Sequence, residues 1–118
     1  MPPRPICKRG DIVLVLFPHS NLRTAKTRPA LVVQADNLQT GLPQVVVAMI
    51  SSRLFRAGHP CRVVVQRASA EGRSSGLLSD SVIMADTLAT VAEPAVERVI
   101  GTYPMSAVDT ALRRALAL

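Results

Sequence analysis

The sequence predicts a mainly β domain of the α+β class, in which a small antiparallel barrel or sheet is closed by one C-terminal helix. Three observations favour this fold class. Short apolar runs rich in β-branched residues recur up to residue 103, and polar, glycine or proline turns separate them. Beyond residue 103 the apolar period changes to that of a helix. The 118 residues contain no internal repeat and fit a single domain, 1–118, that opens with a loose proline-rich segment at 1–9.

Six segments are predicted to be strands because they are short, apolar and rich in β-branched residues. They are residues 11–17, 28–35, 44–51, 61–67, 81–86 and 97–103. The segment 18–27 is predicted to be a polar loop, longer than a tight hairpin needs, and such loops are often functional. Residues 68–76 are predicted to be a flexible connection. Pro94 argues against a long helix at 87–96, which is expected to be a turn or one helical turn.

The last segment, "PMSAVDTALRRALAL", is predicted to be an amphipathic helix. Ser106 precedes Asp109 by three positions, which is typical of a capping box at a helix start. Apolar residues then recur at helical spacing on one face. They are Val108, Ala111, Leu112, Ala115 and Leu116.

Two of the predicted strands, 11–17 and 44–51, are apolar at both alternating sets of positions. An antiparallel sheet with one face in water would alternate apolar and polar residues, so both faces must be covered. The C-terminal helix can cover one face. Either barrel closure or a second subunit can cover the other, and these two alternatives stay open.

The net charge of +6 is unevenly placed along the chain. Residues 1–70 hold ten Lys or Arg and two acids, whereas residues 71–118 hold four Arg and six acids. Arginine, which can bind a phosphate through two donors at once, makes up most of the cations. The pattern favours an anionic partner such as a nucleic acid, and a solvated basic surface is the alternative.

Composition argues against membrane and metal functions. No apolar run reaches the roughly 18 residues of a membrane helix, and the N-terminus has no signal-peptide stretch. We therefore expect a cytoplasmic protein without a membrane partner. Cys7 and Cys61 lie far apart and lack metal-ligand spacing, so we expect reduced thiols, no metal and no cofactor.

Arg28 and Ser51 are the candidate catalytic residues. Arg28 opens the predicted second strand and Ser51 closes the third, so antiparallel pairing would make them neighbours at one rim of the sheet. RNA supplies its own nucleophile, the 2′-hydroxyl, and a guanidinium with a hydroxyl can stabilise the charge that develops on the attacked phosphate. The alternative is that Arg28 is an ordinary surface residue and Ser51 part of a turn.

Further candidate RNA-binding residues lie in or beside the predicted loops. They are His19, Asn21, Arg23, Lys26, Thr27, Ser52, Arg53, Phe55, Arg56 and Ser81. His19 could donate a proton to the leaving oxygen, or it could be an ordinary exposed histidine. Asn21 could contact a base edge or favour the turn, and Ser81 could shape the site or cap a turn. Phe55 is the one plausible stacking residue, flanked by arginines.

Several motifs, in their order and spacing, resemble the MazF/PemK toxins of type II toxin–antitoxin systems. They are "RGDIVLVLF", "RPALVV", "VVVAMISS", "GLLSDSVIMADTL" and "VIGTYP", within about residues 9–116. The resemblance implies an SH3-like barrel, a homodimer and a metal-independent endoribonuclease. Such an enzyme cuts single-stranded RNA, mainly mRNA, at short sequences and leaves a 2′,3′-cyclic phosphate and a 5′-hydroxyl. By position it assigns catalysis to Arg28 and to Ser51, where the family has threonine.

The resemblance also implies a cognate antitoxin whose acidic, partly disordered tail crosses the RNA groove, with operator DNA bound only through that antitoxin. Thr87 and Ala89 stand where the family often has a glutamine and then a basic residue. Two other functions remain open. One is a catalytically weak SH3-like barrel that binds protein or nucleic acid in a toxin–antitoxin repressor complex, and the other is a nucleic-acid binder without catalysis.

Overall fold

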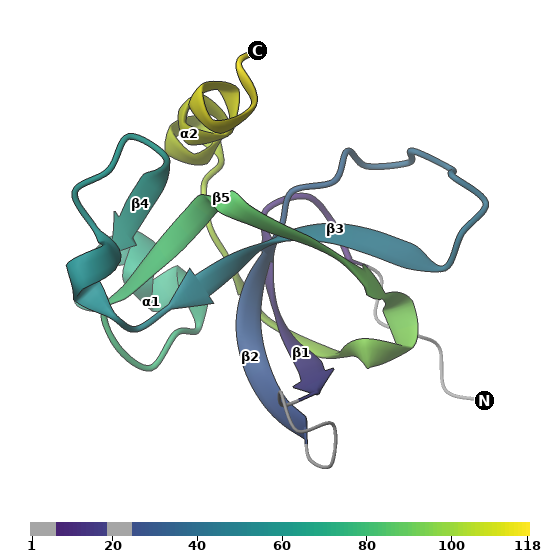
Figure 1. Cartoon of the computed structure of the whole chain (residues 1–118). Helices are drawn as coiled ribbons and strands as arrows, with labels where there is room; N and C mark the ends of the chain where they lie inside the picture. Colours follow the sequence, from purple (N-terminus) through teal and green to yellow (C-terminus); the bar gives the residue numbers. More distant parts are fainter. Residues whose placement is uncertain (1–6, 19–24) are drawn as a thin grey trace.

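The computed structural model describes residues 7–18 and 25–118 (Figure 1). Within these ranges, six antiparallel strands form one sheet in the order β4-β5-β3-β2-β1-β6. The strands are β1 (Asp11–Pro18), β2 (Ala25–Val32), β3 (Gln44–Ser51), β4 (Arg62–Val65), β5 (Ser81–Ala92) and β6 (Val96–Thr102). The helices are α1 (Ala70–Ser75) and α2 (Ser106–Leu116), with 3-10 turns η1 (Leu54–Arg56) and η2 (Glu93–Ala95). The predicted mainly β fold with a C-terminal helix is confirmed.

Both faces of the sheet are buried, as the apolar strands predicted. On β1, Ile12 packs into a core with β4, β5 and α2, whereas Val13 and Val15 pack into a second core. The second core lies inside the curled sheet, between β1, β2, β3, the end of β5 and the start of β6. A single chain therefore covers both faces, so this apolar pattern gives no argument for a second subunit.

The sheet curls almost to a barrel. Only η2 separates the end of β5 from the start of β6, although β3, β2 and β1 lie between these two strands in the sheet. A connection this short forces the sheet to bend until the two strands approach each other (Figure 1). Among the described residues, however, no hydrogen-bonded ladder closes the circle. The predicted barrel closure is therefore not found.

Strand β5 is longer than predicted and carries a kink. Ala48 on β3 pairs with Leu88, but the next residue, Met49, pairs with Met84, so residues 85–87 fall outside this ladder. Such a bulge bends the strand, which lets β5 pair with β4 before the kink and continue along β3 after it. The prediction of a turn or one helical turn over 87–96 is wrong up to Ala92, because pairing with β3 extends the strand to there. The rest of the segment contains the 3-10 turn η2.

The connection at 68–76 contains helix α1, so the prediction of a flexible segment is wrong. The Ser69 hydroxyl accepts a hydrogen bond from the backbone N–H of Gly72, which caps the helix start. Gly76 ends the helix in the left-handed region at φ 74°. The helix packs closely on β6, since a Cβ on Gly101 would lie 2.3 Å from the carbonyl carbon of Ser75.

Helix α2 buries Val108, Ala111 and Leu112 of the predicted apolar face, whereas Leu116 at its end is 51% exposed. The predicted capping box is wrong: Met105 is the N-cap, no side chain caps the start, and Ser106 is already helical. Asp109 instead forms an ion pair with Arg9, whose Nη2 lies 2.6 Å from Asp109 Oδ1. This contact ties the helix to the segment that precedes β1.

Candidate functional site

Arg28 lies inside β2 and does not open it, contrary to the prediction. The hairpin ladder with β1 continues back to Ala25 and places Arg28 opposite Val15. The polar residues Lys26 and Thr27 hid this extension of the strand in the sequence.

The ladder between β2 and β3 is short. It joins Ala30–Val32 to Val47–Met49 and ends beside Pro29, which has no backbone N–H to donate. The same register continued by two residues would set Arg28 opposite Ser51. The predicted strand pairing of Arg28 with Ser51 does not form, although the register of the two strands would bring them opposite each other.

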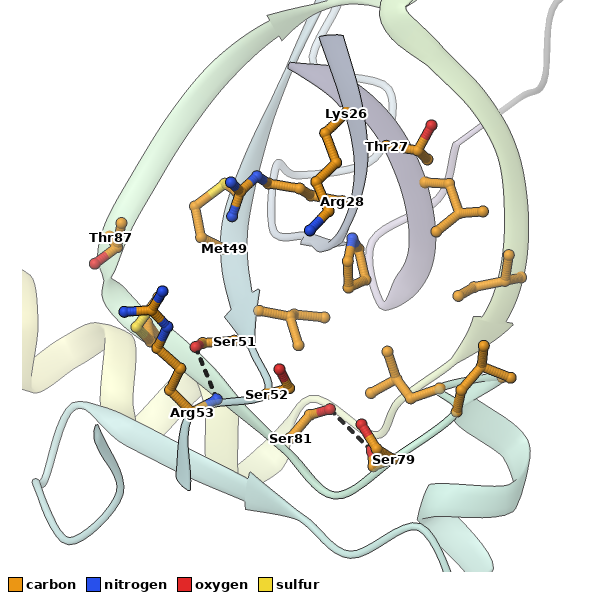
Figure 2. A pocket seen from close by; sticks show the side chains of 18 of the residues that line it. Lys26, Thr27, Arg28, Met49, Ser51, Ser52, Arg53, Ser79, Ser81 and Thr87 are labelled. Atoms are coloured by element: carbon orange, nitrogen blue, oxygen red, sulfur yellow. Dashed lines mark hydrogen bonds between the residues drawn. The ribbon is translucent and has the colours of Figure 1, made fainter. Parts of the chain in front are cut away.

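A cleft of about 810 Å³ opens where these strands part, and both Arg28 and Ser51 line it (Figure 2). Its other cationic lining residues are Lys26, Arg53, Arg56 and Arg98. Its hydroxyl residues are Thr27, Ser51, Ser52, Ser79, Ser81 and Thr87. Its apolar side includes Leu14, Pro29, Ile50, Leu77, Leu78 and Ile100. No acidic residue is among the described residues that line the cleft. The site therefore suits an anion with an apolar part, such as a nucleotide chain.

Arg28 is exposed, and in the described ranges no hydrogen bond or ion pair engages its side chain. Figure 2 shows Lys26 and Arg28 on one side of the cleft, with Ser51, Ser52 and Arg53 across from them. The guanidinium is thus available to bind a phosphate through two parallel N–H donors.

The hydroxyl of Ser51 is held in place although the residue lacks the β-methyl group of threonine. Its Oγ accepts the backbone N–H of Arg53 at 3.1 Å, a bond drawn in Figure 2. A serine hydroxyl has one proton and two lone pairs, so its proton remains available for a ligand. The hydrogen bond restrains a side chain whose rotamer would otherwise be freer than that of threonine.

The segment after β3 carries two cations of the cleft, Arg53 and Arg56, and a hydrogen bond from Arg62 holds it in place. Nη1 of Arg62 donates to the carbonyl oxygen of Arg56 at 2.8 Å. Nε and Nη2 of the same side chain each bind one carboxylate oxygen of Asp86 at 2.8 Å. This hydrogen-bonded pair holds the pKa of Asp86 below its ordinary value and raises that of Arg62. The hydrogen bonds of Arg62 therefore join the kink of β5 to turn η1.

Most of the predicted RNA-binding residues that the structure describes lie on the cleft. Lys26, Thr27, Ser52, Arg53, Arg56 and Ser81 line it. Phe55 does not line the cleft. The residue is 80% exposed, and the Arg56 guanidinium carbon lies 5.8 Å from the centroid of its ring. His19, Asn21 and Arg23 lie outside the described residues.

Sequence reasoning missed Arg98, Arg62 and the position of Thr87. Arg98 reaches the cleft because β6 pairs with β1, where Arg98 faces Leu14. The sequence does not fix the order of strands in the sheet, so it offered no signal for this. Thr87 lines the cleft because the kink in β5 turns that segment toward it.

Three further features of the described ranges concern the cysteines, possible metal ligands and membrane-spanning helices. Cys7 and Cys61 are not joined in a disulfide, and burial raises the pKa of the Cys7 thiol. Among the residues described, no group of three His, Cys, Asp or Glu is arranged to hold a metal ion. No helix in the described part of the chain has the length and apolarity needed to cross a membrane.

Known structures share this fold. An endoribonuclease solved in complex with its cognate antitoxin, from a mycobacterial species, is 19% identical and superposes with a TM-score of 0.73, covering 96% of this chain and 97% of that one. The Mycobacterium tuberculosis toxin MazF-mt6 is 24% identical, with a TM-score of 0.70 and coverage of 92% and 97%. A MazE–MazF structure from Deinococcus radiodurans is 18% identical, with a TM-score of 0.71 and coverage of 95% and 94%.

A family model described as "PemK-like, MazF-like toxin of type II toxin-antitoxin system" matches residues 8–117. The match covers nearly the whole chain, including every strand and both helices. The chain therefore belongs to the PemK-like, MazF-like toxins of type II toxin–antitoxin systems.

Proposed function

We propose that this toxin is a metal-independent endoribonuclease that cuts single-stranded RNA, mainly mRNA, at short sequences. The observation that carries the proposal is the position of Arg28 and Ser51, which come from different strands and line one cleft with four further cations and no acid. Family membership and the endoribonuclease relatives support the same activity.

In the proposed reaction the ribose 2′-oxygen attacks the adjacent phosphorus and the bond to the 5′-oxygen breaks. The 2′-hydroxyl loses its proton to solvent, the leaving 5′-oxygen takes one up, and the products are a 2′,3′-cyclic phosphate and a 5′-hydroxyl. Negative charge grows on the nonbridging oxygens as the new bond forms. Arg28 and Ser51 donate hydrogen bonds to these oxygens, and the bonds strengthen in the transition state.

The remaining cations of the cleft bind the flanking phosphates and do not take part in bond breaking. Lys26, Arg53, Arg56 and Arg98 are spread around its lining, where they can neutralise successive phosphates of one strand. The hydroxyl residues between them can donate to phosphate or ribose oxygens. Binding and catalysis therefore rest on different residues of one surface.

The same charge pattern accounts for neutralisation by a cognate antitoxin. The described lining of the cleft holds several cations and no acid, so the cleft attracts an acidic, partly disordered antitoxin segment as it attracts RNA. Two of the structural relatives reported above are described as an endoribonuclease in complex with its cognate antitoxin and as MazE–MazF. We further propose a homodimer that reaches operator DNA only through the antitoxin.

The test is incubation of the purified protein with mixed RNA in EDTA, followed by mapping of the fragment ends. We expect cuts that end in a cyclic phosphate, and we expect Arg28→Ala to abolish them while the fold persists. RNA that stays intact in every condition, although the protein binds it, would refute the nuclease and support a nucleic-acid-binding module.

A further inference from the structure

Turn η1 buries none of its own residues. Phe55 at its centre is 80% exposed. The turn nevertheless lies between two cations of the cleft lining, Arg53 at its N-cap and Arg56 at its end. Since apolar burial does not hold the turn, polar contacts must fix where these cations point.

Those polar contacts form a continuous chain. The backbone N–H of Arg56 donates to the carbonyl oxygen of Arg53 at 3.1 Å, and the carbonyl oxygen of Arg56 accepts from Arg62 Nη1 at 2.8 Å. Arg62 then binds Asp86 through two bonds of 2.8 Å. A second contact, from Arg56 Nη1 to Met84 Sδ at 3.7 Å, also leads to β5.

The far end of this chain is firmly placed. Asp86 lies in the kink of β5, and the backbone N–H of its neighbour Ala85 donates to the carbonyl oxygen of Cys61 at 2.9 Å. The kink is thus attached to β4, which carries Arg62. Neither Arg62 nor Asp86 lines the cleft, yet the kink also contributes Thr87 to it.

We propose that Arg62 and Asp86 are positioning residues for RNA binding, because their bidentate pair fixes turn η1 and so sets the places of Arg53 and Arg56 in the cleft. This inference rests on the proposed function, and it extends that function to two residues that touch no substrate. Arg28 and Ser51 stand on β2 and β3, and η1 reaches them through one hydrogen bond, from the Arg53 N–H to Ser51 Oγ. Loosening η1 therefore weakens RNA binding more than it slows the chemical step.

The experiment compares Arg62→Gln with Arg67→Gln, which removes the same charge just beyond the end of β4 from an exposed residue outside the cleft. In single-turnover cleavage at increasing protein concentration, we expect Arg62→Gln to raise the half-saturating concentration about tenfold, because a hydrogen bond to a charged group is lost. We expect the maximal rate to stay within about threefold of the parent and Arg67→Gln to change neither quantity appreciably.

Salt dependence separates positioning from simple loss of charge. Binding of an uncleavable single-stranded RNA with 2′-deoxy sugars should lose about 0.7 in its log–log salt slope for each phosphate contact that η1 gives up. We expect this loss in Arg62→Gln and no such loss in Arg67→Gln. Because this RNA is not cut, the measurement tests the pair even if the protein proves not to be a nuclease.

Hydrogen–deuterium exchange supplies the readout that is independent of RNA. We expect faster exchange in Arg62→Gln confined to residues around 53–57, and a smaller effect in the milder Asp86→Asn, which keeps one acceptor. Unchanged exchange in that segment, or a fall in maximal rate without weaker binding, would overturn the proposal. If Arg62→Gln fails to fold, Asp86→Asn and Arg62→Lys give the same comparison, and parental RNA binding in both would overturn it.

Discussion

Removing the hydroxyl of Ser51 should slow the chemical step strongly without unfolding the protein. In Ser51→Ala the lost Oγ leaves the backbone N–H of Arg53 without its acceptor, but Arg53 is exposed and water can replace the bond. The free energy of unfolding should therefore fall by at most about 1 kcal/mol, or about 4 °C in Tm for a domain of this size. The cleavage rate should fall about 100- to 1000-fold, the usual effect of removing one donor to a developing oxyanion.

The assay is single-turnover cleavage of a labelled RNA in EDTA with protein in excess, so that product release does not limit the rate. Thermal unfolding followed by circular dichroism is measured on the same preparations. Ser51→Thr is the matched control, because it keeps the hydroxyl and adds a methyl group that stiffens the rotamer. Its rate should stay within about threefold of the parent, since a change of rotamer costs little.

Two results would refute this reasoning. An alanine variant that cuts RNA at nearly the parental rate would show that the hydroxyl does not contact the reacting phosphate. An alanine variant that unfolds many degrees below the parent would show that Ser51 is structural, and the loss of activity would then say nothing about chemistry.

Three further predictions concern stability. Gly101→Ala places a Cβ 2.3 Å from the carbonyl carbon of Ser75 and should lower the unfolding free energy, measured in urea, by about 1–3 kcal/mol. An unchanged midpoint of the urea unfolding curve would contradict the close packing of α1 on β6. Arg9→Ala removes the 2.6 Å contact with Asp109 and should cost about 1–2 kcal/mol, while cleavage by the folded protein stays unchanged because Arg9 is outside the cleft lining. The hydrogen-bonded pair with Arg62 lowers the pKa of Asp86 from 3.8, so the pair stabilises the fold above pH 3.8 and this stabilisation is lost as the pH falls through the lowered pKa. The difference in unfolding free energy between the parent and Asp86→Asn should therefore become smaller over that pH range. A difference that stays constant with pH would count against the Arg62–Asp86 pair.

The strands could be predicted from the sequence because their apolar runs are local signals. The third strand, 44–51, was predicted with the bounds that the structure has. Errors arose where tertiary contacts decide the structure. Strand β5 continues past residue 86 because β3 provides a partner, and helix α1 forms where Gly72 and Gly101 let the backbone pack closely. Neither effect leaves a periodic pattern in the sequence.

The site could be predicted only where the antiparallel pairing of two strands adjacent in the sequence decides which residues lie together. Arg28 and Ser51 were expected together from the order of two adjacent strands, and the structure places both on one cleft. Arg98 arrives there through the pairing of β6 with β1, which links the two ends of the chain. Arg62 acts through the carbonyl oxygen of Arg56, and no pattern of residue types in a sequence predicts such a contact.

The cleft owes its existence to an interruption of the sheet. In a continued antiparallel ladder, Arg28 and Ser51 would face each other with their Cα atoms about 5 Å apart, too close to admit a phosphate between their side chains. The ladder instead ends at Ala30 and Met49, beside Pro29. Parting of the strands beyond this point turns a cross-strand pair into two walls of a cleft, with the guanidinium on one wall and the hydroxyl on the other. The paired part of β2 and β3 fixes where Arg28 and Ser51 lie along the strands, and the unpaired part leaves room for the substrate between them.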